Sequence, residues 1–218
     1  MSAERIPDDA PASALFPEFD TLYDLIAPEV EGLTDEQLDW TSDKWGWAHW
    51  SIRRQTSHMA SLLYRWLVVR WVDTTFPDGD HGVEDVEGLA VSDNDRALDV
   101  RYHDMDVILG KMREGITIAQ SVLAERTAGF LRSNTLVTDY NPERALVVSA
   151  HPHGITLDAE AGTETTTLEA TFRHMYFEET THLYNIQRLK RAQGLPTVVE
   201  VPRVGYWMLD GWDRSEPD

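Results

Sequence analysis

One unbroken helical repeat constrains the fold of this chain more than any other feature. From residue 98 to residue 123, apolar positions recur in a strict alternation of four and three. They are Leu98, Tyr102, Met105, Leu109, Met112, Ile116, Ala119 and Leu123. A β-strand has a period of two and cannot produce this spacing, whereas an α-helix can. The segment 98–123 therefore predicts one helix of about seven turns with a single apolar face.

Other segments share this amphipathic spacing. A short first helix is predicted over 19–30, and a further turn over 33–38 is marked by the capping-box pair Thr34 and Gln37. The next helix is predicted to begin after Ser51, because serine is a favoured N-cap residue. Its apolar stripe consists of Ile52, Met59, Leu62, Trp66 and Val69.

The last helix carries signals at both ends. A capping box of Thr166 and Glu169 predicts its start. Its apolar positions are Leu168, Phe172, Met175, Ile186 and Leu189. Gly194 can take the left-handed position after a helix and Pro196 cannot continue one, so the helix is predicted to end just before them. Four amphipathic helices predict an all-α fold, a four-helix bundle.

A long acidic connection separates the second and third of these helices. Residues 73–95 contain eight acidic residues, one proline and three glycines. Such a segment is too polar and too interrupted for a core element, and it is typical of a surface crossover. A long crossover allows the two helices that it joins to lie parallel.

A change of pattern before the last helix predicts a small insertion. Residues 145–149 and 155–157 are β-prone, and they flank the turn His151–Gly154. This arrangement predicts a β-hairpin at about 144–158.

The chain is predicted to form one domain with two extensions. The bundle occupies residues 14–195, and residues 1–13 are expected to be a flexible N-terminus. Residues 196–218 carry several valines and aromatic residues. This composition predicts an extended tail that packs on the bundle or on a partner.

Composition limits the partners and the kind of metal site. The chain has 38 acidic against 19 basic residues and no cysteine. The net charge of −19 repels nucleic acid and anionic lipid, and no basic face is concentrated enough to overcome it. A metal site must use His, Asp or Glu, which favours zinc, nickel, iron or manganese. Neither a membrane span nor a targeting signal is evident, so we expect a cytoplasmic protein.

Polar residues interrupt the apolar stripe of the last helix. Glu179 and His182 stand where leucines are expected, and His174, Glu178 and His182 are successive i,i+4 neighbours that can converge on one ion. His58 occupies the corresponding level of the second helix. Each residue alone fits a simpler role, as a hydrogen-bonded core histidine or a surface Glu–His pair. Their joint placement on two long apolar stripes favours a three-ligand metal site with an open face.

The same residues resemble a known family. The matching segments are Trp50–Arg53, Gln55–Ala60, His174, Glu178 and His182–Pro196. They resemble the DinB/YfiT-like superfamily of metal-binding four-helix bundles over about residues 14–196, and Gly32–Leu38 also fits. The resemblance implies His58, Glu178 and His182 as metal ligands. It also implies that His174 is a frequent family histidine outside the ligand set. A glutamate in place of the first histidine of the usual His-x-x-x-His pair is a departure shared with the family's thiol-dependent isomerase branch.

The resemblance implies a function as well. Family members use a divalent metal, zinc or nickel in our expectation, to activate a low-molecular-weight thiol for isomerisation, transfer or hydrolysis of a small-molecule substrate. Two alternatives stay open: a non-catalytic protein that binds a metal or small ligand, and a dimeric interaction protein with a relic site. Glu179 remains a rival to Glu178 as ligand. Eight tryptophans and the apolar tail predict surplus apolar surface and hence a homodimer.

Overall fold

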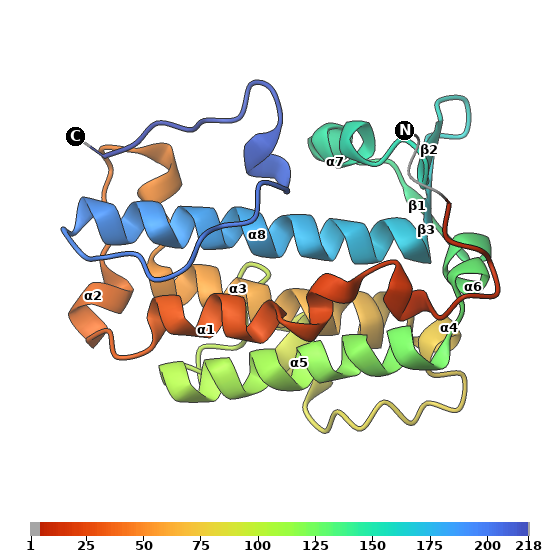
Figure 1. The fold of residues 1–218 in the computed structure, drawn as a ribbon, viewed down its shortest axis with the longest axis horizontal. Coiled ribbons are helices and arrows are strands. Elements are labelled where there is room, and N and C mark those ends of the chain that lie inside the picture. Colours follow the sequence, from red (N-terminus) through yellow and green to blue (C-terminus); the bar gives the residue numbers. More distant parts are fainter. Residues whose placement is uncertain (1–4, 218) are drawn as a thin grey trace.

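The computed structural model describes residues 5–217, apart from the side chain at position 143, and is mostly helical with one small antiparallel sheet (Figure 1). Its longer helices are α1 (Leu22–Val30), α3 (Ile52–Tyr64), α5 (Met105–Glu125) and α8 (Leu168–Ala192). The shorter ones are α2 (Asp35–Asp39), α4 (Val72–Thr75), α6 (Ala128–Ser133) and α7 (Ala145–Ala150). The strands are β1 (Thr135–Asp139), β2 (Ile155–Asp158) and β3 (Thr163–Thr167).

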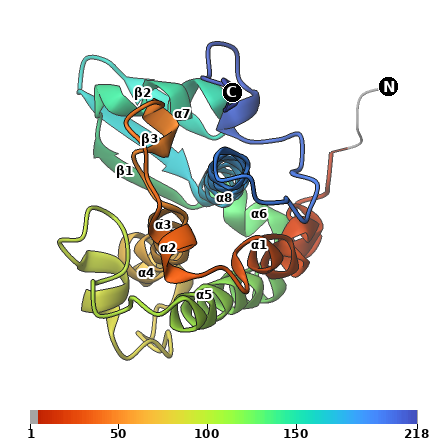
Figure 2. The same ribbon diagram turned by 90° about the vertical axis from the view of Figure 1, so that its left-hand side faces the viewer.

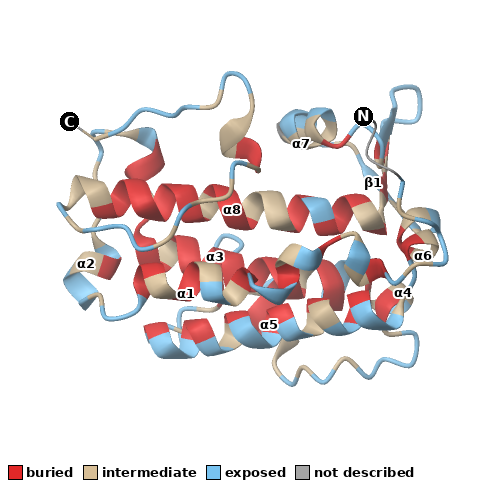
Figure 3. Ribbon diagram, in the orientation of Figure 1, coloured by how far each residue is buried: buried red, intermediate tan, exposed pale blue. Residues whose placement is uncertain are grey.

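The four longer helices lie side by side and enclose the core. Helix α3 packs against both α5 and α8, and α1 packs against the same two helices (Figure 2). The side chains between them are apolar and almost fully buried. Examples are Met59, Leu63, Met112, Ile116, Phe172 and Ile186. Helix α5 has one buried and one exposed face, whereas 17 of the 25 residues of α8 are buried and Figure 3 shows this helix mostly in red.

Several end signals of the helices are confirmed. Thr34 and Gln37 form the reciprocal capping box at the start of α2, and the Ser51 hydroxyl accepts from the Arg54 backbone N–H at the start of α3. Gly194 has a φ of +72° just beyond the end of α8. Local hydrogen bonding and left-handed glycine geometry therefore fix these boundaries as the sequence predicts.

Two predicted helix starts are wrong. The long helix begins at Met105, because the Asp104 carboxylate caps the backbone N–H groups of residues 106 and 107. Leu98 continues the apolar spacing but reaches the core from the preceding loop, where its N–H donates to the Ser57 hydroxyl. Helix α8 is capped by Thr167, not by a Thr166–Glu169 box, since Thr166 belongs to strand β3. The spacing of apolar residues indicates which positions are buried. It does not show that a buried residue is helical, because loop residues can be buried as well.

The predicted hairpin is wrong in its first arm. Residues 145–149 lie in α7, and β2 pairs instead with β3 in a sheet of order β1-β3-β2. The run 145–150 has no alternation of apolar and polar residues, so its pattern fits a short helix as well as a strand. Strand β3 is rich in threonine, whose branched Cβ suits a pleated sheet.

The acidic connection holds little regular structure. Residues 73–95 contain most of α4 and a π-helical turn, Glu87–Val91, and are otherwise irregular. At the other end of the chain, residues 1–4 of the expected flexible segment lie outside the described residues. Ala12 is buried, and its N–H donates to the carbonyl of Arg126.

The C-terminal tail folds back along α8 of its own chain (Figure 1). Tyr206 is buried against this helix, and its N–H donates to the Thr181 hydroxyl. Gly205 precedes it with a φ of +116°, and a Cβ there would lie 2.4 Å from the Thr180 hydroxyl oxygen. Only glycine permits this approach. Part of the apolar tail is therefore buried within its own chain. The homodimer, which was expected partly from this tail, remains a prediction.

A buried ion pair joins α1, α8 and the tail. The Glu29 carboxylate accepts from Lys190 Nζ at 2.5 Å and from Gln187 Nε2 at 2.8 Å. It also accepts from the backbone N–H groups of Val198 and Val199. Burial opposes ionisation of Glu29, but these four donors outweigh it and hold the pKa of its carboxyl below the ordinary 4.5.

We expect Glu29→Gln to lower the free energy of unfolding by about 3–5 kcal/mol at pH 7, because it leaves Lys190 buried without its counter-charge. Urea unfolding measures the loss, and Glu31→Gln on the exposed end of the same helix is the control. Since the pKa of Glu29 is lowered by folding, its contribution is present above pH 4.5 and is lost as the pH falls below it. A loss under 1 kcal/mol would contradict this account.

Candidate metal centre

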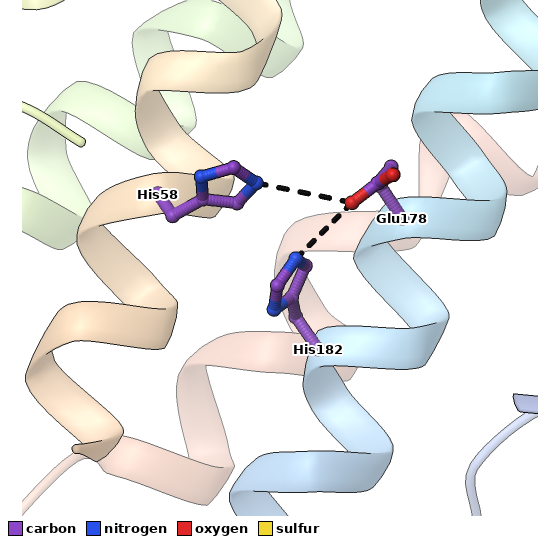
Figure 4. A group of neighbouring side chains, drawn as sticks. All are labelled: His58, Glu178 and His182. Carbon is purple, nitrogen blue, oxygen red and sulfur yellow. Dashed lines mark hydrogen bonds and ion pairs between the residues drawn. The ribbon is translucent and has the colours of Figure 1, made fainter. Parts of the chain in front are cut away.

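Three side chains from α3 and α8 converge at one point in the interior (Figure 4). His182 Nε2 lies 3.1 Å from Glu178 Oε2, and His58 Nε2 lies 3.8 Å from the same oxygen. The two imidazole rings have centroids 4.6 Å apart. One ligand atom from each of the three residues lies within 4.8 Å of the others, so the group can hold a metal ion.

The helices produce this arrangement directly. Glu178 and His182 are one turn apart on α8 and therefore share a face, and His58 reaches them because α3 packs along that face. Trp50 lies just before α3, and its ring stacks on His182 with centroids 6.0 Å apart and contacts His58 at 5.2 Å. The Trp50 ring thus contacts both imidazoles and restricts their positions.

Burial and hydrogen bonding shift the pKa values of two of the three ligand candidates in the direction that metal binding needs. Burial lowers the pKa of His58 to about 4, so its imidazole is neutral at pH 7. Burial alone would raise the pKa of Glu178, but hydrogen bonds with His182 and His58 hold it well below its ordinary value. Gln55 Oε1 contacts His182 Nδ1 and thereby orients the ring with Nε2 toward Glu178.

The structure separates the two glutamates that the sequence left as rivals. Glu178 lies in the cluster, whereas both oxygens of Glu179 are buried and without a hydrogen-bond partner among the described residues. Burial raises the pKa of Glu179 well above its ordinary value, and the charge of Glu178 adds to this effect. The pKa values of these adjacent carboxyl groups are therefore shifted in opposite directions.

A cavity of about 440 Å³ opens beside the cluster. His58, Glu178 and His182 form part of its wall, together with His174 and Tyr206. The Tyr206 hydroxyl lies 2.6 Å from His174 Nδ1, and His174 Nδ1 lies 4.0 Å from the second oxygen of Glu178. Burial lowers the pKa of His174 to about 3 and raises the pKa of Tyr206, so at pH 7 a neutral imidazole and a protonated hydroxyl line the same cavity as the three ligand candidates.

The tail and a buried loop histidine supply parts of this cavity that sequence reasoning missed. His151 Nε2 lies 3.0 Å from the Tyr206 hydroxyl, so one hydroxyl joins two histidines. The sequence predicted only that His151 lies in a turn and that Tyr206 belongs to an extended tail. Burial of a histidine beside a tyrosine is visible only once the tail is placed on α8.

The chain was compared with protein-family models, with curated proteins and with solved structures. No protein-family model, no curated protein and no solved structure matches it. No helix within residues 5–217 is long and apolar enough to cross a membrane. The interpretation of the site therefore rests on its own residues.

We expect Glu179→Gln to raise the free energy of unfolding by about 1–3 kcal/mol at pH 7. The folded chain favours the neutral acid of Glu179, whereas the unfolded chain ionises it above pH 4.5, so the wild type loses stability as the pH rises and the amide variant does not. At pH 4 the gain should nearly vanish. Urea titrations at both pH values test this, with the exposed Glu125→Gln as the control. An equal gain at the two pH values would show that charge is not the cause.

Proposed function

We propose that this chain is a metal-dependent enzyme of the DinB/YfiT-like kind. In this proposal His58, Glu178 and His182 hold a zinc or nickel ion, and a low-molecular-weight thiol takes part in transfer, isomerisation or hydrolysis of a small-molecule substrate. The observation that carries the proposal is the convergence of three ligand atoms on the wall of an open cavity. Three protein ligands with a free position are typical of catalytic metal sites.

The helix arrangement supports the family part of the proposal. Helices α1 and α3 each pack against α5 and α8, which supports the four-helix bundle of that family. A long irregular connection between α4 and α5 corresponds to the crossover of that family. The ligand candidates come from the second and last of these four helices, as the resemblance implies.

The residues divide the chemical work in this proposal. A bound divalent ion would supply Lewis acidity, which lowers the pKa of a coordinated thiol without any protein cysteine. Gln55 and Trp50 orient His182 through a hydrogen bond and ring stacking. Tyr206 and His174 offer a hydrogen-bonded pair that can hold a proton at the Tyr206 oxygen or at His174 Nδ1.

The alternative classes make different use of the same cavity. A non-catalytic protein would bind a metal or small ligand without turnover, and it would not need the Tyr206–His174 pair beside the ligand cluster. An interaction protein with a relic site would need a large apolar face, but Tyr206 of the tail is buried on its own chain. The placement of a proton-holding pair at the cavity favours the enzyme.

We expect the purified chain to bind about one divalent ion and His182→Ala to lose it with little change in helicity. The helices have their own apolar core, so removal of the ion by a chelator should cost only the linkage free energy of binding. Elemental analysis and circular dichroism measure both effects, and the exposed His49→Ala is the matched control.

Turnover is tested by incubating the metal-loaded chain with a panel of low-molecular-weight thiols and electrophilic or amide substrates. We expect thiol consumption that requires both the ion and His182. Metal binding without turnover of any pair would favour the binding protein, and cooperative unfolding by the chelator would make the ion structural.

A further inference from the structure

We propose that Arg65, Arg70 and Arg96 form a subsite that binds the carboxylate group of an organic ligand in the cavity beside the metal centre. If the proposed function holds, this carboxylate ligand is the substrate. Only that role of the ligand rests on the proposed function. Anion binding by the three arginines depends on their own charges and contacts. It can therefore be tested in the metal-free chain.

The charge of the cavity wall is opposite to that of the protein. The chain has a net charge of −19, yet four arginines line this one cavity. Arg144 is neutralised, because it forms hydrogen bonds of 2.8 and 3.2 Å with the buried carboxylate of Glu164. No carboxylate in the described part of the chain forms an ion pair with Arg65, Arg70 or Arg96. Glu178 and Asp95 attract Arg65 only from beyond ion-pair distance, so three positive charges at the cavity have no ion-pair partner among the described residues.

Arg65 shows most clearly that a partner is missing. Its Nε and Nη2 atoms are buried and have no hydrogen-bond partner among the described side chains and backbone groups. Burial lowers the pKa of Arg65 to about 10, and the nearby charge of Arg96 adds to the effect. Burial of an unpaired guanidinium costs free energy that folding alone does not return. A ligand carboxylate would supply both the charge and the acceptors.

A local irregularity of the backbone brings two of the arginines to the same cavity. Residues 65–70 form a π-helical turn after α3, and the Trp71 N–H donates to the Trp66 carbonyl five residues earlier at 3.0 Å. In a regular α-helix, positions 65 and 70 would point about 140° apart. The wider π-turn returns residue 70 to the side of residue 65. Such turns are rare and are frequently found at functional sites.

The remaining wall indicates an organic carboxylate. Trp50, Leu62, Trp66 and Val147 give the cavity an apolar lining that suits a carbon skeleton. A guanidinium matches the two oxygens of a carboxylate with parallel hydrogen bonds. Phosphate sites commonly use glycine-rich loops, and no described glycine lines this cavity. The ligand would place its carboxylate at the arginines and its reactive end near His58.

Isothermal titration of the chelator-treated chain with succinate and benzoate tests the subsite, with succinamide as the uncharged analogue. We expect at least one carboxylate to bind and succinamide not to bind. Arg65→Gln and Arg70→Gln should each weaken binding by roughly tenfold to a hundredfold. Arg113→Gln is the matched control, because Arg113 is exposed and lies 4.1 Å above the Tyr23 ring, much as Arg70 lies 4.4 Å above Trp66.

Stability separates a binding role from a structural one. Removing an unpaired buried charge should leave the melting temperature of Arg65→Gln unchanged or higher, and Arg70→Gln tests the subsite from an exposed position if the first variant does not fold. Equal carboxylate binding by wild type and both variants, or binding of neither carboxylate, would overturn the inference. Tighter binding of inorganic phosphate than of either carboxylate would overturn the ligand class. Arginine-dependent carboxylate binding in a chain that takes up no metal would leave the subsite standing and refute the metal-dependent function.

Discussion

The burial of most of α8 is the constraint on which the rest of the structure depends. An ordinary surface helix leaves its polar face in water, but residues 183–190 of α8, about two consecutive turns, are all buried. A polar group in such a place costs free energy unless it finds a partner inside the protein. Lys190 finds Glu29 on α1, His182 finds Gln55 on α3, and Arg188 donates to tail carbonyls. These contacts hold both the neighbouring helices and the tail in place.

Buried polar groups without a hydrogen-bond partner, on or near this helix, indicate where a ligand can bind. Eight residues in the described part of the chain have a buried side-chain nitrogen or oxygen without a hydrogen-bond partner, and Glu179 and Arg65 are two of them. Glu179 has no hydrogen-bond partner among the described residues and burial raises its pKa, whereas hydrogen bonds with His182 and His58 lower the pKa of its neighbour Glu178. Arg65 lines the cavity that Glu178 also lines, and two of its nitrogen atoms lack a partner in the part of the chain that is described. A site for a cation beside a site for an anion is the arrangement that these charges support.

The sequence predicted those features that depend on local spacing. The i,i+4 relation of Glu178 and His182 and the caps at Thr34 and Ser51 are set within one or two helical turns. Features that depend on distant contacts could not be predicted. Tyr206 reaches His174 only because the tail doubles back, and the apolar run 145–150 fits a helix or a strand until its neighbours are known. The π-turn at 65–70 has no sequence signal, because it replaces α-helical bonds without a proline or a glycine.

The central claim is that His58, Glu178 and His182 hold one divalent ion. It is tested most directly by a crystal structure of the zinc-soaked chain with an anomalous difference map. The account predicts one strong peak at about 2.0–2.2 Å from the Nε2 atoms of both histidines and from a Glu178 oxygen. A peak bound by Glu179, or a zinc ion bound elsewhere with these three side chains uncoordinated, would contradict it.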